Sequence, residues 1–282
     1  MKTTRTTTRY GDMIVAAADS IIARSLVEYG EWTHSEMRLL EQVISPGMSV
    51  LDIGANVGCH TLAFSKAVGA GGKVVAFEPQ PFMFQLLAAN VANNGMTNVL
   101  LLNAAIGNAQ GWIDLPNLRY EEPQNYGAWK LDPFLAKGGE TPKDIPIPVH
   151  RLDDLSVARA ADVIKIDVEG MESAVIEGAR GLIAARRPAL FVENELPGAA
   201  SQALLGLLIG LDYDLYWQIA PLFEEKNFRG NRQNHFRRIT CVNVLGLPRE
   251  RAVPVNGYRK IVSASEHPRD GVTPMGESRI SG

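Results

Sequence analysis

The sequence predicts an α/β protein with a doubly wound sheet, in which helices cover both faces of mostly parallel strands. Three observations predict this fold. Short apolar segments alternate with helical patterns from residue 49 onward. These segments contain few polar residues, which is typical of parallel strands buried on both faces. A glycine-containing turn, "LDIGANVGCH" (51–60), joins the first of them to a helix. We therefore expect a Rossmann-like sheet.

The predicted elements follow one another in a regular order. The first five are a strand in 49–54, a helix in 60–68, a strand in 73–79, a helix in 81–95 and a strand in 99–107. Glycines at 69, 71 and 72 end the first helix, and "NNG" (93–95) ends the second, where left-handed residues are expected. The later elements are a strand in 162–167, helices from 171 and near 200–210, and strands in 189–195, 213–220 and 237–248. The last two strands give the sheet an antiparallel end.

Three segments make up the predicted domain organisation. Residues 1–45 form an N-terminal helical lead-in, because "MIVAAADSIIARSLVEYG" (13–30) resembles an amphipathic helix and is too charged for a signal peptide or a membrane span. Residues 46–248 form the main domain, with inserted polar loops at 115–148 and 220–236. Residues 249–282 form a C-terminal extension, and its polar end, 263–282, is expected to be a flexible tail.

Composition limits the classes of function. The formal net charge is −3, which argues against a general nucleic-acid-binding protein. The two cysteines, Cys59 and Cys241, are far apart and show no metal-ligand spacing. We therefore expect a reduced, cytoplasmic protein without a membrane span or metal site. The sequence leaves open whether it forms a homo-oligomer.

Polar residues follow three successive predicted strands, at the edge where open α/β sheets bind ligands. Gly54 and Gly58 let a ligand approach the backbone of the first turn. Glu78 follows the second strand and is placed to accept hydrogen bonds from two ribose hydroxyls. The predicted cofactor residues of this edge are Asp52, Gly54, Ala55, Asn56, Gly58, Glu78, Asn103 and Ala104, the last two reading an adenine edge.

We considered two kinds of nucleotide as the ligand of this predicted site. A dinucleotide would require G-x-G-x-x-G with its diphosphate on the helix N-terminus. Here the turn is G-x-N-x-G and follows the acidic Asp52, which would repel a diphosphate. An acidic turn suits a ligand with a sulfonium or ammonium group. The pattern therefore favours S-adenosylmethionine as the cofactor.

Six segments of the chain carry a family resemblance: "VLDIGANVG", "VVAFEPQP", "NAAIG", "RLDDL", "VIKIDVEGMESAVIEGA" and "RPALFVENE". Together they resemble the FkbM family of S-adenosylmethionine-dependent methyltransferases, and the resemblance covers about residues 30–245. It implies a class I methyltransferase sheet and O-methylation, often of a sugar or secondary-metabolite hydroxyl. "YGEW" (29–32) resembles the family's lead-in segment over the methionine end, which adds Glu31 to the expected cofactor residues.

"KIDVEG" (165–170) places Asp167 and Glu169 after another buried strand, which is expected to flank the first one. We predict that both are catalytic, with Asp167 accepting the acceptor's hydroxyl proton. The competing interpretation is structural: Glu169 caps the following helix and Asp167 holds a loop amide. Other possible bases are Glu193, His150 and His235. An ion bridging Asp167 and Glu193 is left out, because no metal-ligand spacing supports it.

The two inserted loops are the predicted acceptor site. "FRGNRQNHFRR" (228–238) is either a solvated loop or an arginine rim for an anionic or glycan acceptor. Tyr126 and Trp129 either stack on a sugar or pack the first loop against the domain. Alternatives to O-methylation are a non-catalytic nucleotide-binding module and a nitrogen-directed methyltransferase. The latter would carry Asn or Asp, Pro-Pro and an aromatic residue where this chain has "DVEG".

Overall fold

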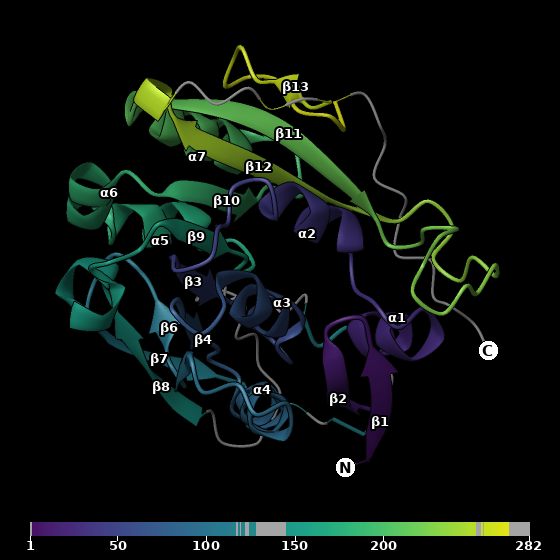
Figure 1. Ribbon diagram of the computed structural model, residues 1–282. Helices are drawn as coiled ribbons and strands as arrows, with labels where there is room; N and C mark the ends of the chain where they lie inside the picture. The colour runs from purple at the N-terminus through teal and green to yellow at the C-terminus, as the bar shows by residue number, and fades with distance from the viewer. Residues whose placement is uncertain are drawn as a thin grey trace.

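An eight-stranded mixed sheet forms the centre of the molecule (Figure 1). The computed structural model describes residues 2–116, 118, 120–121, 124–127, 145–251, 255 and 257–270. Across the sheet, the strands are β13 (Arg259–Lys260), β11 (Tyr213–Pro221), β12 (Thr240–Pro248), β10 (Ala189–Glu193), β9 (Val163–Ile166), β3 (Ser49–Ile53), β4 (Lys73–Phe77) and β5 (Val99–Leu102). Strands β10 to β5 are parallel, and β12 is antiparallel to β10. The predicted fold class is confirmed.

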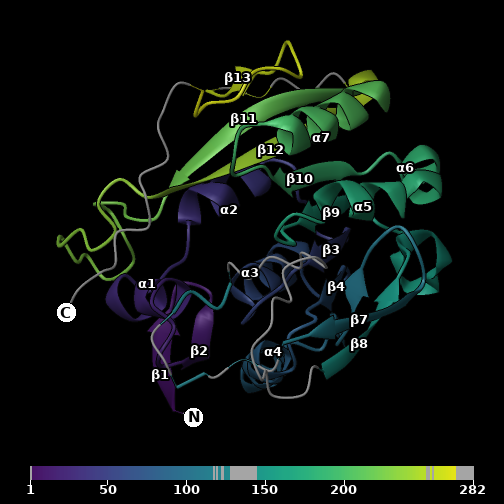
Figure 2. The same cartoon turned by 180° about the vertical axis from the view of Figure 1, so that it is seen from behind.

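Helices cover both faces of this sheet, as Figures 1 and 2 show from opposite sides. One set is α2 (His34–Leu40), α3 (Cys59–Val68) and α4 (Pro81–Asn93), and the other is α5 (Glu172–Glu177), α6 (Arg180–Arg186) and α7 (Ala199–Gly210). Successive strand residues enter different cores. Val50 and Val74 belong to the core under the first set, whereas Leu51 and Val75 belong to the other. Burial on both faces explains why these strands are apolar without alternation.

The order of the strands creates a crevice beside β3. The chain runs from β3 outward through β4 to β5, and later returns to β9 on the opposite side of β3. The strand order therefore reverses between β3 and β9, where open α/β sheets bind ligands at the carboxyl ends of their strands. The loops after β3, β4, β9 and β10 meet at this edge.

The N-terminal segment differs from the helical lead-in that we predicted. It begins with a hairpin of β1 (Thr3–Thr8) and β2 (Gly11–Ala16), and only then forms the short helix α1 (Ile22–Glu28). The threonine-rich β1 is the signal that the helical interpretation overlooked, because β-branched residues favour strands. Asn90 of α4 holds the hairpin: its Nδ2 donates to the Ile14 carbonyl at 3.0 Å, and its Oδ1 accepts from the Ile14 amide at 2.6 Å.

A second, three-stranded sheet lies beside the main one. It consists of β6 (Ala105–Ile106), β8 (Ile145–His150) and β7 (Gly111–Leu115), in that order. The predicted loop 115–148 therefore ends in a strand, which its two prolines concealed. Most of the rest of this loop, including Trp129, lies outside the described residues. Short 3₁₀ helices span Leu152–Asp154, Ser156–Ala158 and Arg249–Arg251.

The C-terminal extension is docked on the sheet as far as it is described. Ile261 is buried, and its amide donates to the Leu215 carbonyl at 2.8 Å. The ring Nε2 of buried His267 lies 2.8 Å from the Asn194 carbonyl. Within the segment expected to be a flexible tail, residues 263–270 make specific side-chain contacts with the sheet. Residues 271–282 lie outside the described part. No helix in the described ranges is long and apolar enough to cross a membrane.

Candidate active site

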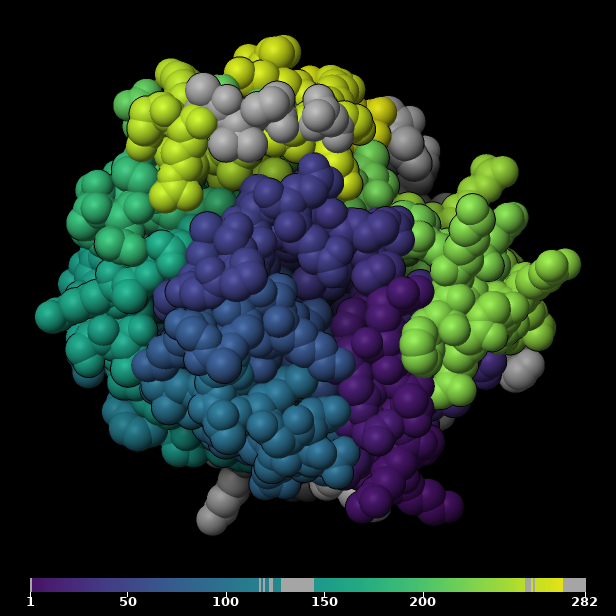
Figure 3. Space-filling view, viewed as in Figure 1, coloured from purple at the N-terminus to yellow at the C-terminus, as the bar shows by residue number. Residues whose placement is uncertain are grey.

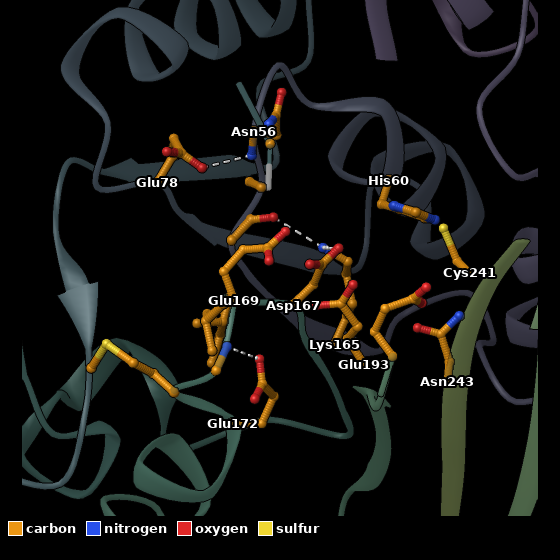
Figure 4. A pocket seen from close by; sticks show the side chains of 18 of the residues that line it. Asn56, His60, Glu78, Lys165, Asp167, Glu169, Glu172, Glu193, Cys241 and Asn243 are labelled. Atoms are coloured by element: carbon orange, nitrogen blue, oxygen red, sulfur yellow. Dashed lines mark hydrogen bonds and ion pairs between the residues drawn. The ribbon is translucent and has the colours of Figure 1, made fainter. Parts of the chain in front are cut away.

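A cavity of about 480 Å³ opens at the carboxyl edge of the sheet (Figure 4). Its walls come from the loops after β3, β4, β9 and β10, the start of α3, part of β12 and the described part of 115–127. Of the predicted site residues, Gly54, Ala55, Asn56, Glu78, Ala104, Asp167 and Glu169 line it. Asp52, Gly58, Asn103 and Glu31 are not among the described lining residues.

Close packing against other parts of the protein requires glycine at two positions of this turn. Gly54 has φ +80°, and a Cβ there would lie 1.7 Å from the carbonyl oxygen of Asp167. A Cβ on Gly58 would lie 2.7 Å from Leu87. The absence of side chains therefore lets the turn pack between the β9 loop and α4. It also leaves the backbone of Gly54 uncovered by a side chain where this residue lines the cavity.

Asp52, at the end of β3, makes contacts inside the protein just before the turn. It is fully buried and accepts a hydrogen bond from the Thr61 hydroxyl at 2.6 Å. Its Oδ1 lies 3.2 Å from the Nζ of Lys165. Asp52, which we predicted to contact the cofactor, thus forms an internal ion pair that joins β3 to β9.

Lys165 joins three parts of the site and was missed in the sequence. It is 3% exposed, donates from Nζ to the Gly54 carbonyl at 3.0 Å, and lies 3.4 Å from Asp167 Oδ2. Burial lowers the pKa of Lys165, but Asp52 and Asp167 raise it by more, so the amine stays charged. The available signal was a lysine inside the apolar run "VIKI", since such a charge requires a partner.

Glu78 lines the cavity from the end of β4, and both of its carboxylate oxygens accept amide hydrogens. Asn56 donates to one oxygen and Gln80 to the other, each at 2.8 Å. Burial raises the pKa of Glu78 to about 7, although these two hydrogen bonds act in the opposite direction. Asn103 Nδ2 donates to the Glu78 carbonyl at 2.8 Å. Asn103 thus supports the Glu78 loop from outside the cavity, while Ala104 lines it.

Glu31 lies away from the cavity and fastens the N-terminal hairpin. It accepts hydrogen bonds from the Arg9 side chain at 2.8 Å and from the Phe228 amide at 2.9 Å. Tyr29 is also occupied elsewhere, because its hydroxyl donates to the Gln233 carbonyl. Of the "YGEW" segment, Trp32 alone is among the described lining residues. The predicted role of Glu31 in cofactor binding therefore does not fit its position.

Three carboxylates meet on the side of the cavity formed by β9 and β10. One oxygen from each of Asp167, Glu169 and Glu193 lies within 4.8 Å of the others. Burial and the charges of Asp167 and Glu169 raise the pKa of Glu193 well above its ordinary value. Glu172 Oε1 accepts a hydrogen bond from the Gly170 amide at 2.8 Å, just before α5. The structure thus brings both predicted catalytic residues into the cavity, together with Glu193.

His60 is a second lining residue that the sequence reasoning missed. It stands in the first turn of α3, and its Nε2 lies 3.1 Å from Glu36 Oε2. Both side chains are buried. Its position directly after the glycine turn was the available signal. The alternative bases His150 and His235 are not among the described lining residues, and His235 instead contacts Arg24.

The arginine-rich segment does not form a rim on this cavity. Arg229 donates to the Thr6 hydroxyl at 2.6 Å and to the Thr7 carbonyl at 2.9 Å. Figure 3 shows the yellow-green segment that contains it against the purple N-terminal hairpin. No arginine occurs among the described lining residues. Tyr126 is fully buried, with its ring 4.8 Å from that of Tyr120, so it packs the first loop and offers no platform for a sugar.

Comparison with known proteins identifies a family for this chain. The model of the methyltransferase FkbM domain matches residues 52–229. A protein-L-isoaspartate O-methyltransferase of Arabidopsis thaliana is 39% identical over 57 residues, which are 20% of this chain and 24% of that protein. A crystal structure of methyltransferase FkbM from Methylobacillus flagellatus KT matches with TM-score 0.43 and 20% identity, covering 70% of this chain and 43% of that one. Fibrillarin of Aeropyrum pernix, solved with natively bound S-adenosyl-L-methionine, matches with TM-score 0.43 and 11% identity, covering 86% of this chain and 82% of that one. The chain thus spans less than half the length of the first two relatives.

The family match covers more than half of the 282 residues and includes the glycine turn, Glu78 and the three clustered carboxylates. It confirms the resemblance seen in the sequence. The protein belongs to the FkbM family of methyltransferases.

Proposed function

We propose that the enzyme transfers the methyl group of S-adenosylmethionine to a hydroxyl group of a sugar, glycan or secondary metabolite. The observation that carries this proposal is the distribution of carboxylates in one cavity. Glu78 lies at one side of the Gly54–Asn56 turn, and the Asp167–Glu169–Glu193 cluster lies at the other (Figure 4). The cavity volume of about 480 Å³ falls in the usual range for ligand sites.

In this proposal, Glu78 binds the ribose and the Gly54–Asn56 backbone faces the methionine part of the cofactor. Each Glu78 oxygen already accepts one amide hydrogen and retains a lone pair for a ribose hydroxyl. Ala104 lies on the adenine side. Among the described lining residues, carboxylates outnumber Lys165, the one lysine, and this negative field suits a sulfonium ion.

Methyl transfer then proceeds as a direct displacement. The acceptor oxygen forms a bond to the methyl carbon while the bond from that carbon to sulfur breaks, and its electron pair stays on sulfur. The cofactor leaves as neutral S-adenosylhomocysteine. We assign the hydroxyl proton to Asp167, whose side chain is 39% exposed and is held by Lys165. Orientation of the acceptor and the cofactor in the cavity supplies much of the rate enhancement.

The cofactor affinity should depend on pH through Glu78. Because the pKa of this carboxyl is about 7, it is largely neutral below that pH and accepts ribose hydroxyls poorly. We expect the affinity for S-adenosylmethionine to rise with pH up to about 7.5, by as much as about tenfold per unit. Calorimetric titrations between about pH 5.5 and pH 8.5 measure this, with Glu78→Gln as the control.

The Glu78→Gln variant is titrated over the same range, so that ionisation of the ligand itself can be subtracted. It should bind at least about tenfold more weakly at high pH, since hydrogen bonds to a charged acceptor contribute about 1.5–3 kcal/mol each. Its affinity should change less with pH than that of the wild type. An identical pH profile for both proteins would remove Glu78 from ribose binding.

The target atom is tested by incubating the enzyme with S-adenosylmethionine carrying a labelled methyl group and a panel of acceptors. The panel contains polyhydroxylated sugars, phenols, amines and short nucleic acids. We expect methyl ethers, identified by nuclear magnetic resonance of the product. Label only on nitrogen would favour the nitrogen-directed alternative, against which the "DVEG" segment argues. We further propose a cytoplasmic location, supported by two free cysteines, and a small-molecule or glycan acceptor rather than a nucleic acid.

A further inference from the structure

We propose that Asp167, Glu169, Glu193 and the amide oxygen of Asn243 form a binding site for a divalent cation beside the cofactor. The three carboxylates come from the ends of the neighbouring parallel strands β9 and β10. Their ligand oxygens lie within 4.8 Å of one another. Two oxygens bound to one Ca²⁺ ion at about 2.3–2.6 Å are separated by no more than about 5 Å. The cluster therefore has the dimensions of one ion's coordination shell.

Asn243 supplies the independent observation. It is 5% exposed and lies directly opposite Glu193 in the β10–β12 pair. Its Nδ2 donates to Glu36 Oε1 at 3.1 Å and to Gln218 Oε1 at 3.0 Å. Because both of these partners are acceptors, the orientation of the amide is fixed. Figure 4 shows the amide oxygen turned toward the Glu193 carboxylate.

In this arrangement, the amide oxygen of Asn243 and the carboxylate of Glu193 face each other, and no hydrogen-bond donor lies between them. No hydrogen bond to the Asn243 amide oxygen or to the Glu193 carboxylate is present within the described part of the chain. Both groups line the cavity, so these oxygens face the space that an ion would occupy. Lys165 cannot serve as a counter-ion for the whole cluster, since it is already bound to Asp52 and the Gly54 carbonyl. An ion bound by carboxylate and amide oxygens satisfies both groups, and these are the ligands that Mg²⁺, Ca²⁺ and Mn²⁺ prefer.

The role of this ion rests on the proposed function, whereas the site itself rests on the contacts above. An open coordination position would hold the acceptor's hydroxyl oxygen beside the methyl group and lower the pKa of that hydroxyl. The acceptor oxygen would still bond to the methyl carbon as the carbon–sulfur bond breaks, and Asp167 would still accept the hydroxyl proton. The acceptor would then be a molecule whose hydroxyl can bind a metal ion.

The site is tested with Mn²⁺ as the probe, added to the full-length protein without cofactor or acceptor. Electron paramagnetic resonance counts the free ion, and competition with Mg²⁺ and Ca²⁺ ranks the ions. We expect one saturable Mn²⁺ per chain. Glu193→Gln should weaken its binding at least tenfold, and Asn243→Leu should weaken it severalfold. Glu172→Gln is the matched control: it removes one charge from the same cavity but should change the affinity less than threefold.

Three results would overturn the cation site. They are the absence of saturable Mn²⁺ binding, binding that survives Glu193→Gln unchanged, and equal losses for Glu193→Gln and Glu172→Gln. If no saturable Mn²⁺ binding were found, we would infer that a proton on Glu193, donated to the Asn243 amide oxygen, takes the place of the ion. Titration of the same preparations with S-adenosylmethionine keeps this separate from the proposed function. Cofactor binding without Mn²⁺ binding would refute the cation site alone.

Discussion

Asp167→Asn should reduce the turnover number by about 10²–10⁴-fold, the usual contribution of a group that accepts a proton in the reaction. The substitution keeps the size of the side chain and its ability to accept a hydrogen bond from Lys165, but it removes the charge. Cofactor affinity should change little, because Asp167 lies on the acceptor side of the cavity, with Glu169 and Glu193. Steady-state kinetics with an acceptor from the panel, together with calorimetry, separate the two effects.

Glu172→Gln is the matched control for this experiment. Glu172 lines the same cavity and follows the same strand, but its carboxylate accepts the Gly170 amide hydrogen. Glutamine can keep that hydrogen bond through its amide oxygen, so turnover should stay within about threefold of the wild type. A wild-type rate in Asp167→Asn would contradict our assignment and point to Glu169 or Glu193. Parallel losses of stability and activity would make Asp167 a structural residue.

Lys165→Met should destabilise the folded protein by about 3–5 kcal/mol, because it leaves the buried charge of Asp52 without its partner. Asp52 is fully buried and Lys165 is 3% exposed, so water cannot replace the lost contact. Urea denaturation followed by circular dichroism measures this loss. Methionine has a similar length, which limits the contribution of an empty volume.

The double variant Asp52→Asn/Lys165→Met tests the cause. It removes both charges, while asparagine can still accept the hydrogen bond from Thr61. We expect it to recover at least half of the stability that Lys165→Met loses. If the double variant were no more stable than Lys165→Met, the loss would come from packing and not from an unpaired charge. A loss below about 1 kcal/mol for Lys165→Met would show that the ion pair contributes little.

The fold was readable in the sequence because its signals are local. Apolar runs such as "KVVAF" and the glycine turn each depend on a few neighbouring residues, and they predicted β3, β4, β9 and β10. The hairpin was missed because "MIVAAADS" has the composition of a helix. Its pairing with β1 and the contact of Asn90 with Ile14 stabilise it as a strand.

The site was readable only in part, because several of its contacts join distant parts of the chain. Glu78 and Asp167 follow strands directly, so their position was predictable. The roles of Asp52 and Asn103 were not, since each turns away from the cavity toward a partner that only the fold reveals. The pairing of Glu193 with Asn243 depends on the register of the antiparallel β10–β12 pair, which no sequence spacing discloses.

The most direct test of this account is a calorimetric titration of the wild-type protein with S-adenosylmethionine and, separately, with NAD. We expect one equivalent of bound S-adenosylmethionine, competition by S-adenosylhomocysteine, and no binding of NAD, because the Gly54–Asn56 turn and Glu78 offer no site for a diphosphate. Binding of NAD without binding of S-adenosylmethionine would contradict it.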